Sequence, residues 1–304
     1  MNRNIKKILL FLGLTFFFDW LLAGLFFGLG GKADTLPAIA MAIGYMFVPM
    51  IMAIIVQRCV CKEGVAGPLG ISFGLNRWFL VAWLLPPVVA FATLGVSLLM
   101  PGVSYSPEMA GMFERFKSIL TPEKLEEMQR EVGTLPLHPI WIGLLEGLIA
   151  GVTVNAIAAF GEELGWRGLL QRELGHLGFW RSSAVIGAIW GVWHAPLILH
   201  GHNYPEHPQL GVLLMVAWCM LLAPIFGYVR LRAKSVIAAA IIHGTLNGTY
   251  GLSIMVVEGG NDLTTGMTGL PGFIVLAVVN VALLVYERFL AKEAIGDESE
   301  TVPH

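Results

Sequence analysis

The sequence predicts an all-α, polytopic membrane protein, and three observations support this fold class. Hydrophobic residues make up 56% of the 304 residues, charged residues only 13%, and the mean hydropathy is +0.72. Soluble domains carry about 25% charged residues, so this composition indicates a chain largely surrounded by lipid. The apolar residues also fall into eight runs, most of them close to the roughly 20 residues that a helix needs to cross a bilayer.

About eight transmembrane helices are therefore predicted. The first run follows the basic residues Arg3, Lys6 and Lys7 and is longer than the core of a signal peptide, which spans roughly 7–15 residues, so we interpret it as a retained span. The predicted spans are 8–29, 36–57, 78–100, 139–160, 182–199, 210–229, 236–257 and 270–290. Together they form one integral-membrane domain over residues 1–295, and the acidic tail 296–304 is expected to be disordered.

The connections indicate topology and one further element. Most Lys and Arg residues fall on the side of the two termini, so the positive-inside rule places both termini in the cytoplasm. Between spans three and four, an apolar stripe at helical spacing predicts an interfacial helical segment within 101–138, most simply a structural cap. This stripe is formed by Met109, Met112, Phe113, Phe116 and Leu120. The net charge of −2 gives no indication of a nucleic-acid partner.

Three groups of polar residues interrupt the apolar runs within a core at about 140–255. Ionisable groups at such depth are energetically costly and are functional by default. The groups are Glu162, Glu163 and Arg167, then Trp190 and His194, then His243 and Asn247. Counted from the predicted cytoplasmic helix ends, all three lie at a similar depth, so they can meet at one level. Small-residue pairs such as Gly244 and Gly248 would let the helices approach closely.

Helical spacing separates the two glutamates. Glu163 and Arg167 are four residues apart and face each other, which predicts an internal ion pair. Glu162 points about 100° away, so this pair leaves its carboxylate available. A buried carboxylate beside an imidazole can polarise a water molecule for attack on a carbonyl carbon. A second histidine and an asparagine amide can donate hydrogen bonds to the oxyanion that forms.

Two chemical alternatives stay open at this stage. No serine or cysteine lies within the three groups, which favours attack by activated water over a covalent intermediate. Glu162, His194 and His243 could instead bind zinc with a water as fourth ligand. The His-Glu-x-x-His pair typical of zinc proteases is absent, so no cofactor is expected and zinc is the minority interpretation. We interpret Cys59, Cys61 and Cys219 as ordinary thiols.

The motifs Glu162-Glu163-x-x-x-Arg167, aromatic-x-x-x-His194 and His243-x-x-x-Asn247, in this order, resemble the CAAX prenyl protease and bacteriocin-processing family. This family contains the type II CAAX prenyl endopeptidases, and the resemblance covers about residues 140–250. It implies an intramembrane endopeptidase of the glutamic type with a cytoplasmic catalytic entrance. Glu162 and His194 would activate water, His243 and Asn247 would form the oxyanion hole, and Glu163 and Arg167 would support the site. Trp190 replaces the usual Phe and would narrow the pocket.

The resemblance leaves the substrate open. It implies a membrane-embedded or lipidated protein or peptide, cleaved within the lipid bilayer. A non-catalytic membrane partner, such as a bacteriocin self-immunity protein, is the main alternative. A proton-coupled transporter is a weaker one, because the sequence shows no internal repeat.

Several further polar residues have no assigned role in these interpretations. The loop residues His200, His202 and His207, with Glu206 among them, are more simply interfacial side chains than a metal site. Within the predicted spans, Asp19 and Glu146 are expected only to form hydrogen bonds or to face an aqueous cavity.

Overall fold

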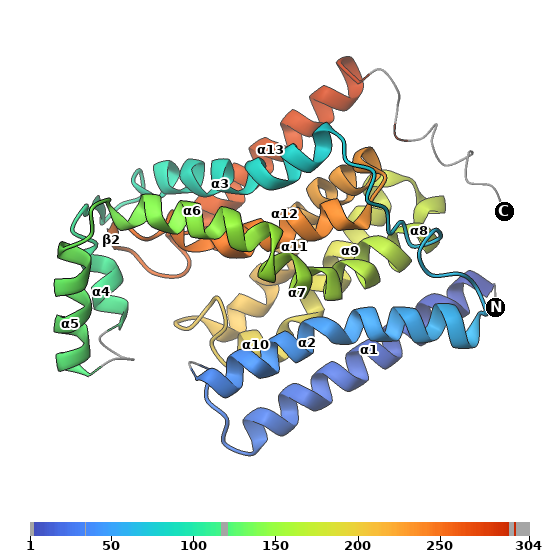
Figure 1. Cartoon of the computed structure of the whole chain (residues 1–304), viewed down its shortest axis with the longest axis horizontal. Helices are drawn as coiled ribbons and strands as arrows, with labels where there is room; N and C mark the ends of the chain where they lie inside the picture. The colour runs from blue at the N-terminus through green and yellow to red at the C-terminus, as the bar shows by residue number, and fades with distance from the viewer. Residues whose placement is uncertain (1–2, 34, 117–120, 292–294, 296–304) are drawn as a thin grey trace.

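The computed structural model describes residues 3–33, 35–116, 121–291 and 295. About 74% of the chain is helical, which confirms the all-α class. The predictions for Leu120 and for the tail 296–304 lie outside the described residues. Figure 1 shows the N-terminal end of α1 and the C-terminal end of α13 toward one end of the molecule, with α4 and α5 at the other. The predicted topology requires this arrangement, whereas the cytoplasmic location stays a prediction.

Within the described residues, five helices are long and apolar enough to span a membrane, or six if one bent pair counts as a span. The five are α1 (Arg3–Gly28), α2 (Leu36–Ile54) with the π-helix η1 (Ile55–Val60), α3 (Arg77–Ser97), α11 (Pro208–Ala233) and α13 (Leu270–Phe289). The prediction of eight spans is therefore not confirmed.

Two predicted spans are shorter than the sequence suggested. The fifth is divided into α9 (Phe179–Trp193) and α10 (Ala195–Leu199). The seventh is α12 (Val236–Thr249), followed by the 3-10 turn η4 (Tyr250–Ser253) instead of continuing to residue 257. At 1.5 Å per residue, helices of 14 and 15 residues reach only about 21–23 Å, less than the roughly 30 Å hydrocarbon core.

The predicted fourth span is bent by 50° at Thr153, between α6 (Pro139–Val152) and α7 (Val154–Glu163). Thr153 lies outside the helical region (φ −121°, ψ −106°), and its hydroxyl donates to the Ile149 carbonyl at 2.7 Å. It is one of three consecutive β-branched residues, which fit a helix less well than straight chains. Beyond α7 the chain continues through η2 (Leu164–Leu170), α8 (Gln171–Glu173) and η3 (Gly175–Leu177). The two glutamates therefore lie in mid-helix, not at the end of a span.

Helix α12 runs through the middle of the bundle and contacts α3, α6, α7 and α11 (Figure 1). A Cβ atom at Gly244 would lie 2.6 Å from the Ala156 nitrogen, so glycine permits this close approach of α12 to α7. The other small-residue pairs also mediate close approaches, but with different partners: Gly187 faces Met220 of α11, and Gly161 faces Met46 of α2. Only the pair on α12 joins two helices that carry polar groups.

The end of the molecule opposite the termini has a feature that the sequence did not predict. Strand β1 (Val103–Tyr105) pairs antiparallel with β2 (Val257–Gly259), with Ser104 opposite Glu258. Helices α4 (Ala110–Phe116) and α5 (Pro122–Gly133) follow β1. Met109, expected in the interfacial helix, precedes α4 with φ 59°. The interfacial location of this segment stays a prediction.

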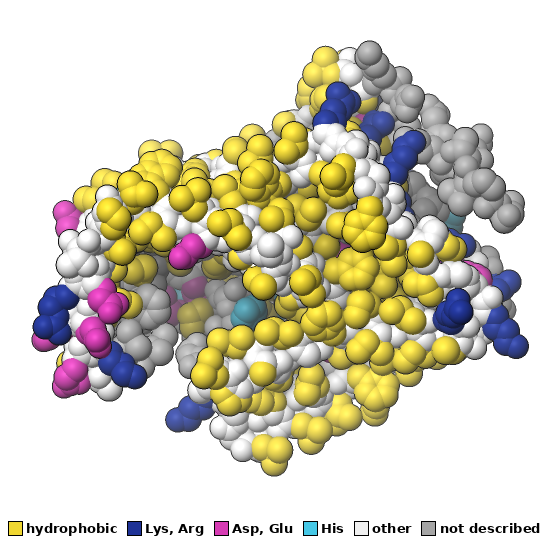
Figure 2. Space-filling view, in the orientation of Figure 1, with side chains coloured by type: hydrophobic (Ala, Val, Ile, Leu, Met, Phe, Trp, Pro, Cys, Tyr) yellow, Lys and Arg dark blue, Asp and Glu magenta, His cyan; other side chains and the backbone are white. Residues whose placement is uncertain are grey.

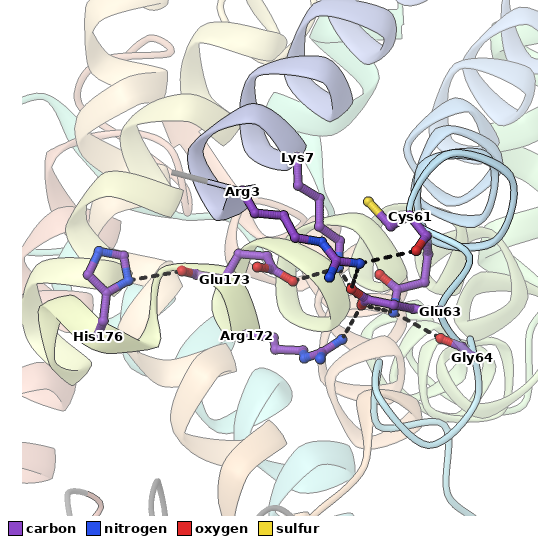
Figure 3. A network of polar contacts seen from close by, with 9 residues as sticks. Arg3, Lys7, Cys61, Glu63, Gly64, Arg172, Glu173 and His176 are labelled. Carbon is purple, nitrogen blue, oxygen red and sulfur yellow. Dashed lines mark hydrogen bonds and ion pairs between the residues drawn. The ribbon is translucent and has the colours of Figure 1, made fainter. Parts of the chain in front are cut away.

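A charged network joins α1 to the helix that carries the glutamates (Figure 3). Lys7 of α1 is 4% exposed and donates to Glu63 at 2.9 Å and to Glu173 at 2.7 Å. Arg3 and Arg172 also pair with Glu63, at 3.1 and 3.3 Å. Partial burial alone would raise the pKa of Glu63, but the Lys7 hydrogen bond and the three cations outweigh it. The pKa of Glu63 therefore lies below its ordinary value of 4.5.

We expect Glu63→Gln to lower the melting temperature in detergent at pH 7, by about 2–4 °C for each kcal/mol lost. Because the folded-state pKa is lowered, the carboxylate stabilises the fold above pH 4.5 and loses this effect as the pH falls below it. The difference between parent and variant should thus shrink from pH 7 toward pH 3. A difference independent of pH would contradict the assigned role of the Glu63 charge.

Candidate active site

Glu163 connects two helices through one carboxylate oxygen. Its Oε1 accepts hydrogen bonds from Arg167 Nη1 at 2.9 Å and from His243 Nδ1 of α12 at 2.8 Å. The predicted i,i+4 ion pair is therefore present, and both partners are at most 1% exposed. The Arg167 guanidinium also lies over the rings of Trp190, 4.4 Å from the centroid, and Phe226, at 5.0 Å. Arg167 is thus held by one charge and two aromatic faces.

Glu162 is held in a different way. Its Oε2 accepts hydrogen bonds from the indole nitrogens of Trp190 at 2.7 Å and Trp166 at 3.3 Å. Its Oε1 lies 4.0 Å from His243 Nε2. Within the described part of the chain, no Lys or Arg side chain pairs with Glu162. As the helical spacing predicted, the Arg167 pair leaves this second carboxylate available.

His194 lies where α9 gives way to α10. Pro196 has no N–H to donate to the preceding turn, and the N–H groups of Leu197 and Ile198 both bond to the His194 carbonyl. The His194 ring nitrogen Nδ1 is 2.8 Å from the Trp190 carbonyl oxygen. Because a carbonyl can only accept, Nδ1 carries the hydrogen and donates. A neutral His194 therefore keeps Nε2 as an acceptor.

Asn247 follows His243 by one turn and is exposed, with no hydrogen bond to the described residues. The structure thus brings Glu162, Glu163 and His243 into one cluster, whereas Asn247 lies beside it with its amide unengaged. Figure 2 shows a hollow in the surface between α6 and α2, with a histidine side chain visible inside it. The His243 side chain keeps 6% of its surface accessible.

Two tryptophans have closer roles than the sequence suggested. Trp190, which the sequence predicts to narrow the pocket, also donates the shorter of the two indole hydrogen bonds to Glu162. Trp166 was not singled out at all, although it lies four residues after Glu162 and so on the same helical face. Attention to indole donors one turn from a buried carboxylate would have identified it.

The zinc interpretation depends on the donor atoms of Glu162, His194 and His243. The Nδ1 atoms of both His194 and His243 are engaged, so only their Nε2 atoms could bind a metal, and Glu162 Oε1 lies 4.0 Å from His243 Nε2. Among the described residues, no group of three or more His, Cys, Asp or Glu side chains is placed to hold a metal ion. Zinc at Glu162, His194 and His243 stays the minority interpretation.

The loop histidines are bound to neighbouring segments. The Nδ1 atom of His200 bonds to the Pro196 carbonyl. Its ring stacks on Phe27, with ring centroids 3.7 Å apart. His207 Nδ1 bonds to Asp262 at 2.6 Å. These contacts of His200 and His207 join the loop to α1 and to the segment before α13.

Comparison with known proteins supports the resemblance seen in the motifs. Residues 143–249 match the family described as type II CAAX prenyl endopeptidase Rce1-like. This range contains all three polar groups and extends from α6 to the end of α12. No curated protein matches the chain. The family resemblance is therefore confirmed for the segment that carries the candidate site, and it indicates a membrane protease.

We expect Glu163→Gln to destabilise the protein by about 3 kcal/mol or more, because Arg167 would lose its counter-charge while it stays buried. Thermal unfolding in detergent would measure the loss. Glu162→Gln is the matched control: it removes a neighbouring carboxylate that pairs with no described cation, and it should change stability much less. Equal heat stability of Glu163→Gln and the parent would show that the ion pair does not support the fold.

Proposed function

We propose that this chain is an intramembrane endopeptidase that hydrolyses a peptide bond with a water molecule activated by Glu162 and His194. One observation carries the proposal. The Glu162 carboxylate is 2% exposed, has no Lys or Arg partner among the described residues, and is oriented by two indole N–H groups on one oxygen. Its other oxygen faces His243. Such a carboxylate has no structural need for its charge, whereas a general base requires it.

The His194 geometry supports a role in proton transfer. Its Nδ1 is fixed by the Trp190 carbonyl, which leaves Nε2 to accept a proton from water or to return it to the leaving amine. The same Trp190 residue donates its indole N–H to Glu162. Trp190 therefore couples the positions of the two groups proposed to activate water, beyond the narrowing of the pocket that its size implies.

We assign His243 and Asn247 to stabilisation of the oxyanion. A carboxylate can only accept, so His243 Nδ1 donates to Glu163 and Nε2 donates only when the ring is a cation. Two carboxylates flank this ring: Glu163 Oε1 lies 2.8 Å from Nδ1 and Glu162 Oε1 lies 4.0 Å from Nε2. Glu163 thus orients His243, while Arg167 balances the charge of Glu163. The exposed Asn247 amide is free to donate to the same oxygen.

The substrate we propose is a membrane-associated protein or peptide, with a prenylated CAAX sequence as the class named by the matching family. The apolar environment suits a lipid-anchored chain that reaches the site from the bilayer. The hollow between α6 and α2 offers a path for water and peptide (Figure 2). The hollow lies toward the end that carries α4 and α5 (Figure 2), so the cytoplasmic entrance that we propose, at the end of the molecule where the termini lie, is a separate opening.

Purified protein in detergent should cleave a fluorogenic prenylated CAAX peptide, and Glu162→Gln should reduce kcat by about 10²–10⁴-fold, the usual contribution of a general base. The variant should remain folded, because it loses no ion pair with a described cation. Cleavage by Glu162→Gln at the parental rate would refute the assignment of Glu162.

A parallel reaction with a zinc chelator provides the control for mechanism. Activity that persists in chelator supports water activation by Glu162 and His194. Activity that is lost in chelator and restored by added zinc would instead give Glu162, His194 and His243 the role of ligands.

A further inference from the structure

The break in helix at His194 leaves one backbone group to be satisfied from elsewhere. In a continuous helix the Trp193 carbonyl would accept from Leu197, but the Leu197 N–H bonds to His194. The Trp193 carbonyl instead accepts from the Tyr45 hydroxyl of α2 at 2.7 Å and from the Trp20 indole of α1 at 3.3 Å. The N-terminal hairpin α1–α2 therefore stabilises the break in the helix at which His194 Nδ1 bonds to the Trp190 carbonyl.

The side chain of Trp193 is held by the same hairpin. Its indole nitrogen donates to Asp19 Oδ2 of α1 at 2.6 Å. Asp19 is fully buried, on the inward face of α1 with Phe11 and Thr15. Its second oxygen, Oδ1, has no hydrogen-bond partner among the described residues. A buried carboxylate with a single donor is costly, so its retention needs an explanation beyond packing.

The Trp193 ring contacts His194 and also the Trp166 ring, which donates to Glu162. It packs edge-on against His194, with ring centroids 4.7 Å apart, and edge-on against Trp166 at 5.7 Å. Trp166 in turn donates to Glu162. The position of this one indole ring therefore limits the positions of both His194 and the Trp166 donor to Glu162.

We propose that Asp19 is a positioning residue of this site, which holds the Trp193 indole and thereby fixes the His194 ring. The inference rests on the proposed function only for its catalytic consequence; the hydrogen bond and the ring contacts stand without it. Asp19 also lies outside residues 143–249, so the site is completed by a helix that the family match does not cover.

The first arm of the test is NMR of detergent-solubilised protein labelled at tryptophan and histidine. The Trp193 indole signal is assigned by its absence in Trp193→Phe, and the His194 ring signals by their absence in His194→Gln. In Asp19→Ala we expect the Trp193 indole proton to move upfield and the His194 ring signals to shift. Thr15→Val is the matched control, since Thr15 lies one turn away on the same buried face and its hydroxyl has no described partner.

The second arm is kinetic. Asp19→Ala and Trp193→Phe should each lower kcat by about 10–100-fold with little change in KM, because a misplaced reacting group affects the chemical step more than binding. Asp19→Asn should recover most of the activity, since its amide oxygen can accept the same hydrogen bond. The double variant should be no slower than either single one, because both remove the same interaction.

The two arms distinguish failure of this inference from failure of the proposed function. Identical His194 signals in Asp19→Ala and in the parent would overturn the positioning role. So would a double variant whose loss in kcat is the product of the losses in the two single variants. If Asp19→Ala does not fold, Asp19→Leu, which keeps a side chain of similar size and removes only the acceptor, decides the same question. If the parent cleaves no peptide, the proposed function fails, and the NMR arm still decides whether Asp19 positions His194.

Discussion

The arrangement of the helices around the site depends on the two hydrogen bonds that Glu163 accepts. A membrane interior offers no water to solvate a charge, so each buried ion must find its partners within the protein. One oxygen of Glu163 binds both Arg167 and His243, and this fixes α7 and η2 against α12. Because Arg167 is engaged by Glu163 and by two aromatic faces, it does not neutralise Glu162. The Glu163–Arg167 pair therefore leaves the Glu162 carboxylate without an Arg partner.

Both breaks in the helical pattern serve this arrangement. The bend at Thr153 turns α7 away from the direction of α6, so that Glu162 and Glu163 lie in mid-helix against α12. The break at His194, set by Pro196, changes the hydrogen-bond pattern of the backbone at the histidine. Regular spans would have carried the same residues, yet with different neighbours. Local irregularity, rather than residue identity alone, gives each group its partner.

Sequence reasoning identified what helical spacing determines. The Glu163–Arg167 pair and the separate direction of Glu162 follow from 3.6 residues per turn, and both are present in the structure. Hydropathy could not locate helix ends, because the apolar runs continue through turns, as in the predicted span that ends in η4 and β2. The sequence also could not predict which side chains meet between different helices. No spacing within one helix indicates that Trp190 donates to Glu162, or that Asp19 meets Trp193 across 174 positions of sequence.

These contacts across helices change what counts as the site. The three motifs lie within residues 143–249, but two of their structural supports come from the first helix. Lys7 ties the start of α1 to Glu173 at the end of the helix that carries the glutamates. Further along the same face of α1, Asp19 holds the Trp193 ring beside His194. Because Lys7 and Asp19 lie on the same buried stripe of α1, a shift of that helix would move both ends of the site together. The N-terminal helix therefore supports the candidate site as well as packing against α2.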